Sequence, residues 1–81
     1  MIVYAKTALK QLARLTPSVA AIICAKIVQY DEQPASLANQ VKKLKGQPFL
    51  RLRVGDYRVI FTAEGVVLTI IKIGHRREIY D

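Results

Sequence analysis

Cysteine is nearly absent from this sequence, and so is any long apolar run. Cys24, the only cysteine among 81 residues, has no partner for an internal disulfide. It lies in an apolar segment without a neighbouring His or acid, which favours buried packing over a reactive thiol. No segment approaches the roughly 18 apolar residues of a membrane span, and residues 1–6 lack the charged leader of a signal peptide. We therefore expect a cytoplasmic protein with no membrane partner.

Acidic residues are also scarce, with six Asp and Glu against 13 Lys and Arg, and the net charge is +7. Residues 1–41 carry four basic and two acidic side chains, whereas residues 42–81 carry nine and four. A basic half favours a polyanionic partner, either nucleic acid or an acidic protein, although a charged surface also serves solubility. Because 52% of the residues are hydrophobic, we expect a folded single domain over residues 1–81.

The first half of the chain carries helical patterns. Residues 2–4 resemble a short strand, and residues 8–15 then place apolar side chains at helical spacing. Thr16-Pro17 is a start signal for a second helix, because a capping hydroxyl precedes a proline at the first helical position. The loop at residues 31–34 should end this helix. Residues 37–43 are expected to form a brief further helical turn.

From Phe49 onward the period of the pattern changes to two, which indicates strands. Two-residue turns at Gly55-Asp56 and at Glu64-Gly65 predict a three-stranded antiparallel meander. The order of helix, helix and meander predicts an α+β fold, with the two N-terminal helices packed on one face of a small twisted antiparallel sheet.

The pleat of the first hairpin separates its side chains by chemistry. A two-residue loop at Gly55-Asp56 pairs Val54 with Tyr57 and Arg53 with Arg58. The apolar residues then share the face that the helices should cover: Leu50, Leu52, Val54, Tyr57, Val59, Phe61, Leu68 and Ile70. The opposite face carries Arg51, Arg53 and Arg58. Like charges opposed across strands are unfavourable, so this cluster favours a site for phosphate over a purely solvated face.

The segment after the last strand adds further polar groups, namely His75, Arg76, Arg77 and Tyr80. With the sheet arginines, such groups suit cleavage of a phosphodiester by its neighbouring 2′-hydroxyl. That reaction needs a base, an acid and positive donors. A lone His without a second His or Cys at ligand spacing indicates no metal site, and we expect no cofactor.

Each of these groups also has a simpler interpretation. His75 can be a solvated surface residue, and Tyr80 can be a packing residue that closes the sheet. Lys42, Lys43 and Lys45 can be ordinary solvated lysines or contacts to the nucleic-acid backbone. Phe49 can stack on RNA, but its place at a strand start favours a core residue.

Three blocks resemble the RelE/ParE superfamily of toxins from type II toxin-antitoxin systems. They are Lys43 to Gly46, Leu50 to Phe61 and Gly74 to Tyr80, in this order after a helical hairpin. The resemblance implies a RelE-like microbial ribonuclease type of fold. It also implies a cognate antitoxin with an acidic, partly helical segment, and operator DNA bound only through the antitoxin complex. In the RelE branch it implies an endoribonuclease that cleaves mRNA in the ribosomal A site and so inhibits translation.

By position, Arg51, Arg58, Arg76 and Tyr80 match the residues that the RelE branch uses. The resemblance implies that the arginines hold the scissile phosphate and that Tyr80 transfers a proton or stacks on a base. His75 is a further candidate for proton transfer, because Phe49 stands where well-known members carry a basic residue. Arg53, Arg77, Lys43 and Lys45 would add contacts to RNA. Two other functions remain open, a ParE-like inhibitor of DNA gyrase and an inactive relative that binds only its antitoxin.

Overall fold

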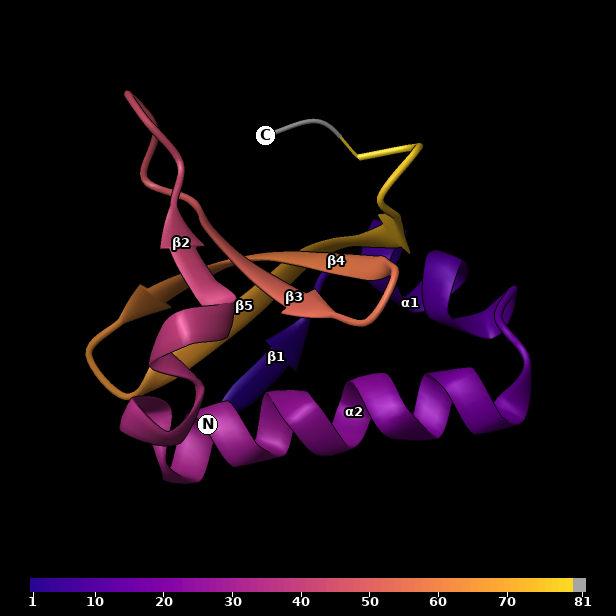
Figure 1. Ribbon diagram of the computed structural model, residues 1–81, viewed down its shortest axis with the longest axis horizontal. Helices are drawn as coiled ribbons and strands as arrows, with labels where there is room; N and C mark the ends of the chain where they lie inside the picture. The colour runs from indigo at the N-terminus through magenta and orange to yellow at the C-terminus, as the bar shows by residue number, and fades with distance from the viewer. Residues whose placement is uncertain (80–81) are drawn as a thin grey trace.

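The protein is a five-stranded mixed sheet with helices against one face, as seen in a computed structural model that describes residues 1–79 (Figure 1). Along the sheet the strand order is β1-β5-β4-β3-β2. The α+β class is therefore confirmed. Within residues 1–79, no helix is both long and apolar enough to cross a membrane. The elements are β1 (Ile2–Tyr4), α1 (Lys6–Ala13), α2 (Pro17–Glu32), the 3-10 helix η1 (Pro34–Gln40), β2 (Val41–Lys43), β3 (Leu50–Val54), β4 (Tyr57–Glu64) and β5 (Val67–His75).

Helix α2 begins as its local sequence predicts. The Thr16 hydroxyl oxygen accepts a hydrogen bond from the backbone N–H of Val19 at 3.4 Å, and Pro17 occupies the first turn. This cap satisfies one of the backbone donors that a helix start leaves without a partner. Helix α2 then runs for 16 residues along one side of the sheet (Figure 1).

Two edge strands extend the expected meander. β1 pairs with β5 in parallel, and β2 pairs with β3 in antiparallel register, with Val41 opposite Leu52. The prediction of a helical turn through Lys43 was therefore wrong for its last three residues. A helical period reports only local contacts, whereas residues 41–43 become extended through hydrogen bonds to a strand that follows later in the chain.

The β3–β4 hairpin has the predicted register, with Val54 opposite Tyr57 and Arg53 opposite Arg58. The next turn lies one residue later than expected, at Gly65-Val66, because Glu64 pairs with Val67 and Gly65 has φ +58°. Moving a two-residue turn by one position shifts the pairing by two residues. The predicted facing of Leu68 and Ile70 therefore survives.

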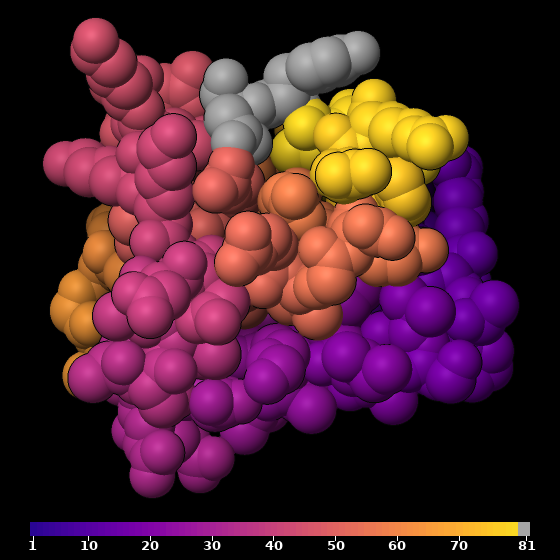
Figure 2. Space-filling model, in the orientation of Figure 1, coloured from indigo at the N-terminus to yellow at the C-terminus, as the bar shows by residue number. Residues whose placement is uncertain are grey.

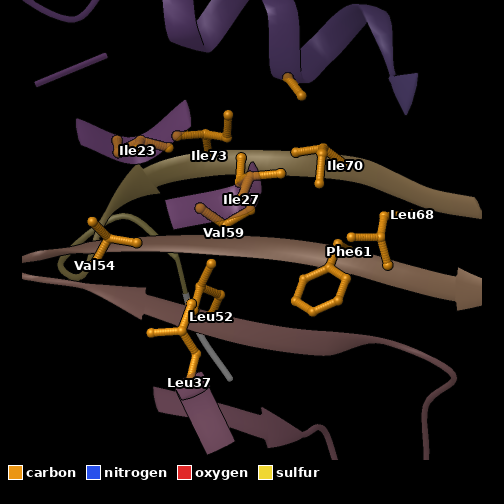
Figure 3. Close-up of a cluster of buried hydrophobic side chains, with 11 residues drawn as sticks. Ile23, Ile27, Leu37, Leu52, Val54, Val59, Phe61, Leu68, Ile70 and Ile73 are labelled. Carbon is orange, nitrogen blue, oxygen red and sulfur yellow. The ribbon is translucent and has the colours of Figure 1, made fainter. Parts of the chain in front are cut away.

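One core lies between the helices and the apolar face of the sheet (Figure 3). Ala8 of α1 and Ile23 of α2 are completely buried, and the Tyr30 ring meets Phe61 edge-on with centroids 5.2 Å apart. Both helices therefore pack on the same sheet face, as predicted. The buried cluster comprises Ala8, Ile23, Ile27, Leu37, Leu52, Val54, Val59, Phe61, Leu68, Ile70 and Ile73.

Beyond the end of β1, a glutamine side chain accepts a hydrogen bond from the edge of β5 that β1 no longer covers. The Ala5 N–H still donates to the Ile70 carbonyl at 2.9 Å, but the chain then turns into α1. Further along β5, the Ile73 N–H donates to Gln11 Oε1 at 2.7 Å. This bond satisfies a backbone donor at the sheet edge and fixes α1 beside the end of β5 that carries the C-terminal segment.

Cys24 is less buried than its sequence context predicted. It is half-buried, and its sulfur accepts a hydrogen bond from the Tyr4 hydroxyl at 3.6 Å. Burial raises the pKa of Tyr4, and this hydrogen bond raises it further. The pair joins α2 to β1.

Neighbouring isoleucines on α2 test this account of the core. We expect Ile23→Ala to lower the free energy of unfolding by about 2–5 kcal/mol, because Ile23 is fully buried and its removal leaves a cavity. Ile22 is 56% exposed, so Ile22→Ala should cost less than about 0.5 kcal/mol. Urea unfolding of the two variants makes the comparison, and equal losses would contradict the assigned helix face.

Candidate functional site

The face of the sheet opposite α2 carries the arginines of the hairpin. Arg53 and Arg58 are direct neighbours across β3 and β4, and Arg51 lies one pair further along, opposite Ile60. Because side chains alternate along a strand, these arginines point away from the core that Leu52 and Val59 enter. The sheet thus concentrates three guanidiniums on one face.

Arg58 is held over the turn by its own hairpin. Its Nη1 donates to the carbonyl oxygens of Gly55 and Tyr57, each at 3.0 Å. Partial burial lowers the pKa of Arg58, and the positive charges of Arg51, Arg53 and Arg76 lower it further. An arginine still remains charged at neutral pH. An anion that entered the cluster would be attracted by all four guanidiniums and would offset their mutual repulsion.

Arg76 joins this cluster because the C-terminal segment docks on the β3–β4 turn. Its backbone N–H donates to the Asp56 carbonyl at 2.7 Å, and its Nε lies 3.8 Å from Asp56 Oδ1. Figure 2 shows the C-terminal segment in yellow against the orange side chains of the hairpin. The Arg76 side chain is 57% exposed, so this ion pair is a weak, solvent-screened contact. An incoming phosphate can therefore compete with Asp56.

A tight turn after β5 sets the path of the C-terminal segment. The N–H groups of Glu78 and Ile79 both donate to the His75 carbonyl, at 2.8 and 3.2 Å. The Ile79 side chain folds back over Gly74, where a Cβ would lie 3.0 Å from Ile79 Cδ1. A glycine at position 74 is what permits this close approach.

His75 does not lie with the arginines. Its strand position is opposite Tyr57, and the two rings meet edge-on at 5.6 Å, on the helix side of the sheet. The cause is a register shift at Ile60/Phe61, which changes the faces of the β5 residues that follow. The His75 Nδ1 accepts a hydrogen bond from the Arg77 N–H at 3.2 Å, and the Arg77 side chain is exposed. Tyr80 lies outside the described residues.

The neighbouring lysines of β2 lie on opposite faces of the sheet. Lys43 pairs with Leu50 and so lies on the helix side of the sheet, whereas Lys42 pairs with Arg51 on the arginine face. Lys72, opposite Ile60, extends the same row. Lys45 is exposed in the β2–β3 turn. Sequence reasoning missed Lys72 and did not place Lys42 beside the arginines, because the register shift in β5 and the pairing of β2 are not visible locally.

A hollow of about 540 Å³ lies next to the arginines on the same face. Its floor contains Leu44 and Ile60, which are buried but separate from the main core. Phe49 lines one wall and is only half-buried. The interpretation of Phe49 as a core residue was therefore wrong, because Phe49 shares the strand face of Arg51 rather than that of Leu50.

The chemistry of this face suits an anion. Among residues 1–79, no group of three His, Cys, Asp or Glu side chains could hold a metal ion. Clustered guanidiniums can instead bind phosphate oxygens through several charge-assisted hydrogen bonds. The fold and the site therefore define a small basic protein with an arginine-rich sheet face beside a hollow that both apolar and polar side chains line.

Comparisons with known proteins identify the family. The sequence model described as the ParE toxin of the type II toxin-antitoxin system parDE matches residues 2–80. The chain thus belongs to this toxin family, within the RelE/ParE superfamily that its motifs resemble. No curated protein matches the sequence.

Solved structures agree with this assignment. The RelB-RelE antitoxin-toxin complex of Methanococcus jannaschii contains a chain that is 27% identical, with a TM-score of 0.76 over 98% of this chain and 95% of that one. The intact Escherichia coli RelBE complex gives 26% identity and a TM-score of 0.76, over 93% and 94% of the two chains. The Staphylococcus aureus YoeB-YefM complex, at 15% identity and a TM-score of 0.75 over 93% and 94%, shows only the shared fold.

Gly74→Ala tests the geometry of the C-terminal turn. The new Cβ would crowd Ile79 Cδ1 and Cγ1, at 3.0 and 3.1 Å, so we expect a loss of about 1–3 kcal/mol in unfolding free energy. In the double variant Gly74→Ala/Ile79→Ala the crowding atoms are gone. Thermal unfolding of the unmodified protein, the two single variants and the double variant completes a double-mutant cycle. The double variant should lose less stability than the sum of the two single losses. Strict additivity would show that the two residues do not meet.

Proposed function

We propose that this toxin is a ribosome-dependent endoribonuclease that cleaves mRNA and so stops translation in the cytoplasm. The observation that carries the proposal is the convergence of Arg51, Arg53, Arg58 and Arg76 on the sheet face opposite the helices. Resemblance to RelE structures over nearly the whole chain supports the same activity. Fold alone does not decide function, and the arginine cluster is the feature that favours this activity.

The reaction would be attack by a ribose 2′-hydroxyl on the adjacent phosphorus. The P–O5′ bond then breaks and leaves a 2′,3′-cyclic phosphate and a 5′-hydroxyl. Negative charge develops on the phosphate oxygens in the transition state, and preorganised guanidinium donors stabilise it. Arg58, held by two carbonyls, suits this role, and Arg76 approaches from the C-terminal segment. No metal ion or cofactor enters these steps.

Proton transfer in this scheme is assigned to Tyr80, from its place in the family motif. His75 would act more indirectly, because its ring packs on Tyr57 and its Nδ1 holds the Arg77 N–H. We assign Arg51, Arg53 and the exposed Arg77, Lys43 and Lys45 to RNA binding. The first two lie on the reacting face, whereas Lys43 and Lys45 lie at the edge strand and its turn, where they can meet flanking backbone phosphates.

Primer extension on a reporter mRNA in a purified translation system tests the activity. With ribosomes, we expect position-specific cuts by the unmodified protein and a loss of about 10²–10³-fold in Arg76→Ala, because one transition-state donor is removed. Arg14→Ala removes another exposed arginine, at the C-cap of α1, and should cut normally. Full cleavage by Arg76→Ala would refute the site, and an uncut message with unmodified protein would refute the activity.

Inhibition of DNA gyrase is the second candidate function, because the matching family model is described as a ParE toxin of parDE. The same arginine face would then meet an acidic surface of a protein or DNA. A supercoiling assay with purified gyrase distinguishes the two functions. Loss of supercoiling without RNA cuts would favour the ParE-like function, whereas an inactive relative would give neither effect.

We also propose a cognate antitoxin whose acidic, partly helical segment covers the arginine face, with operator DNA bound only by the complex. Structural neighbours solved as toxin-antitoxin complexes support such a partner. Charge complementarity should make binding salt-sensitive.

Calorimetry of the antitoxin complex tests this partner surface. We expect affinity to fall by at least roughly tenfold between 0.05 and 0.5 M NaCl, because salt screens exposed charges. Arg53→Ala should weaken binding and flatten the salt dependence, whereas Lys6→Ala, an exposed change on α1, should do neither. Affinity independent of salt would place the antitoxin elsewhere.

A further inference from the structure

The hollow beside the arginines suggests how the substrate is held. We propose that it is a nucleobase subsite, in which an unstacked mRNA base next to the scissile phosphate stacks on Phe49. This inference rests on the proposed ribonuclease function and adds a specificity-determining pocket to it. The volume of about 540 Å³ lies within the range of small-molecule sites, about 300–1,000 Å³.

The hollow and the arginines are adjacent by strand register. Phe49 lies two positions before Arg51, on the same face of the chain, and residues so spaced are about 7 Å apart along a strand. Ile60, in the floor of the hollow, is the direct cross-strand neighbour of Arg51. A phosphate held by Arg51 and Arg58 therefore places the base of the same or the next nucleotide over the hollow.

Phe49 has the exposure that stacking requires. It is half-buried in a wall of the hollow and lies outside the main hydrophobic cluster. An aromatic side chain set among cations is the combination that binds single-stranded RNA, because the ring holds a base while the cations hold the backbone. A ring confined to the protein core could not do this.

Polar side chains at the rim can read the edge of the bound base. The Gln11 amide is oriented by the hydrogen bond that its oxygen accepts from Ile73, so the group it offers to the hollow is its NH₂ donor. Lys72 also supplies donors, from β5. Glu78, from the C-terminal turn, supplies only acceptors. Donors from Gln11 and Lys72 and an acceptor from Glu78 can discriminate between base edges.

Cleavage mapping with Phe49 variants tests the subsite. In the ribosomal primer-extension assay, we expect Phe49→Ala and Phe49→Leu each to lower the rate at subsaturating toxin by about 5- to 150-fold, because base stacking is lost. Phe49→Tyr retains the ring and should remain within about twofold of the unmodified protein. Phe49→Leu keeps an apolar side chain, so it separates stacking from simple hydrophobic packing. Thermal unfolding of each variant checks that it is folded.

Glu78→Gln tests reading of the base edge. The amide can donate as well as accept, so cut sites should spread to bases that present an acceptor where the original sites present a donor. Glu64→Gln, an exposed change at the far end of β4, should leave the cut-site distribution unchanged.

The outcomes separate the two proposals. Cleavage by the unmodified protein that is lost in Phe49→Ala and Phe49→Leu, kept in Phe49→Tyr and redistributed in Glu78→Gln supports the subsite. Cleavage that all folded variants perform at the same rate and positions would overturn the subsite and leave the ribonuclease function intact. Absence of cleavage by the unmodified protein would overturn both.

Discussion

The site depends on the pairing register of the β3–β4 hairpin. With a two-residue turn at Gly55-Asp56, Arg53 must lie opposite Arg58 and Leu52 opposite Val59. The pleat then sends one set to solvent and the other to the core. A slip of one residue would bury the guanidiniums and expose the apolar side chains, so burial of the helices against the sheet also enforces the geometry of the basic face. Stability and site geometry are therefore linked in one hairpin.

A single irregularity in the sheet determines what the C-terminal segment contributes. The register shift at Ile60/Phe61 sends Ile73 into the core and His75 toward Tyr57. With regular alternation, both would lie on the arginine face. The shift instead leaves Gly74 there, and the absence of a side chain lets Ile79 fold back beside the hollow. Arg76 then reaches the hairpin turn through Asp56. The bulge thus selects which residues of one short motif meet the arginines.

The basic face is electrostatically unfavourable in the isolated protein. Partial burial lowers the pKa of Arg58, and the charges of Arg51, Arg53 and Arg76 lower it further, whereas the exposed Asp56 acts in the opposite direction. The free energy of unfolding of a small domain is modest, since only about 60% of its chain surface is buried, so such repulsion is a substantial cost. A phosphate or an acidic partner would relieve it. This connects the two kinds of partner proposed for the toxin, because substrate and antitoxin would use the same charges.

The sequence by itself determined the helix start at Thr16-Pro17, the hairpin register and the gathering of Arg51, Arg53 and Arg58 on one face, because all three follow from local geometry. Its ordered motifs also indicated the toxin superfamily that the family comparison confirms. Tertiary structure decided the rest. β2 forms only through hydrogen bonds to β3, and the bulge in β5 depends on two strands fitting together, so neither Lys42 beside Arg51 nor His75 beside Tyr57 could be read from local periods. The hollow at Phe49 needs the β2–β3 turn, β4, β5, α1 and the C-terminal turn together, and therefore exists only once the chain has folded.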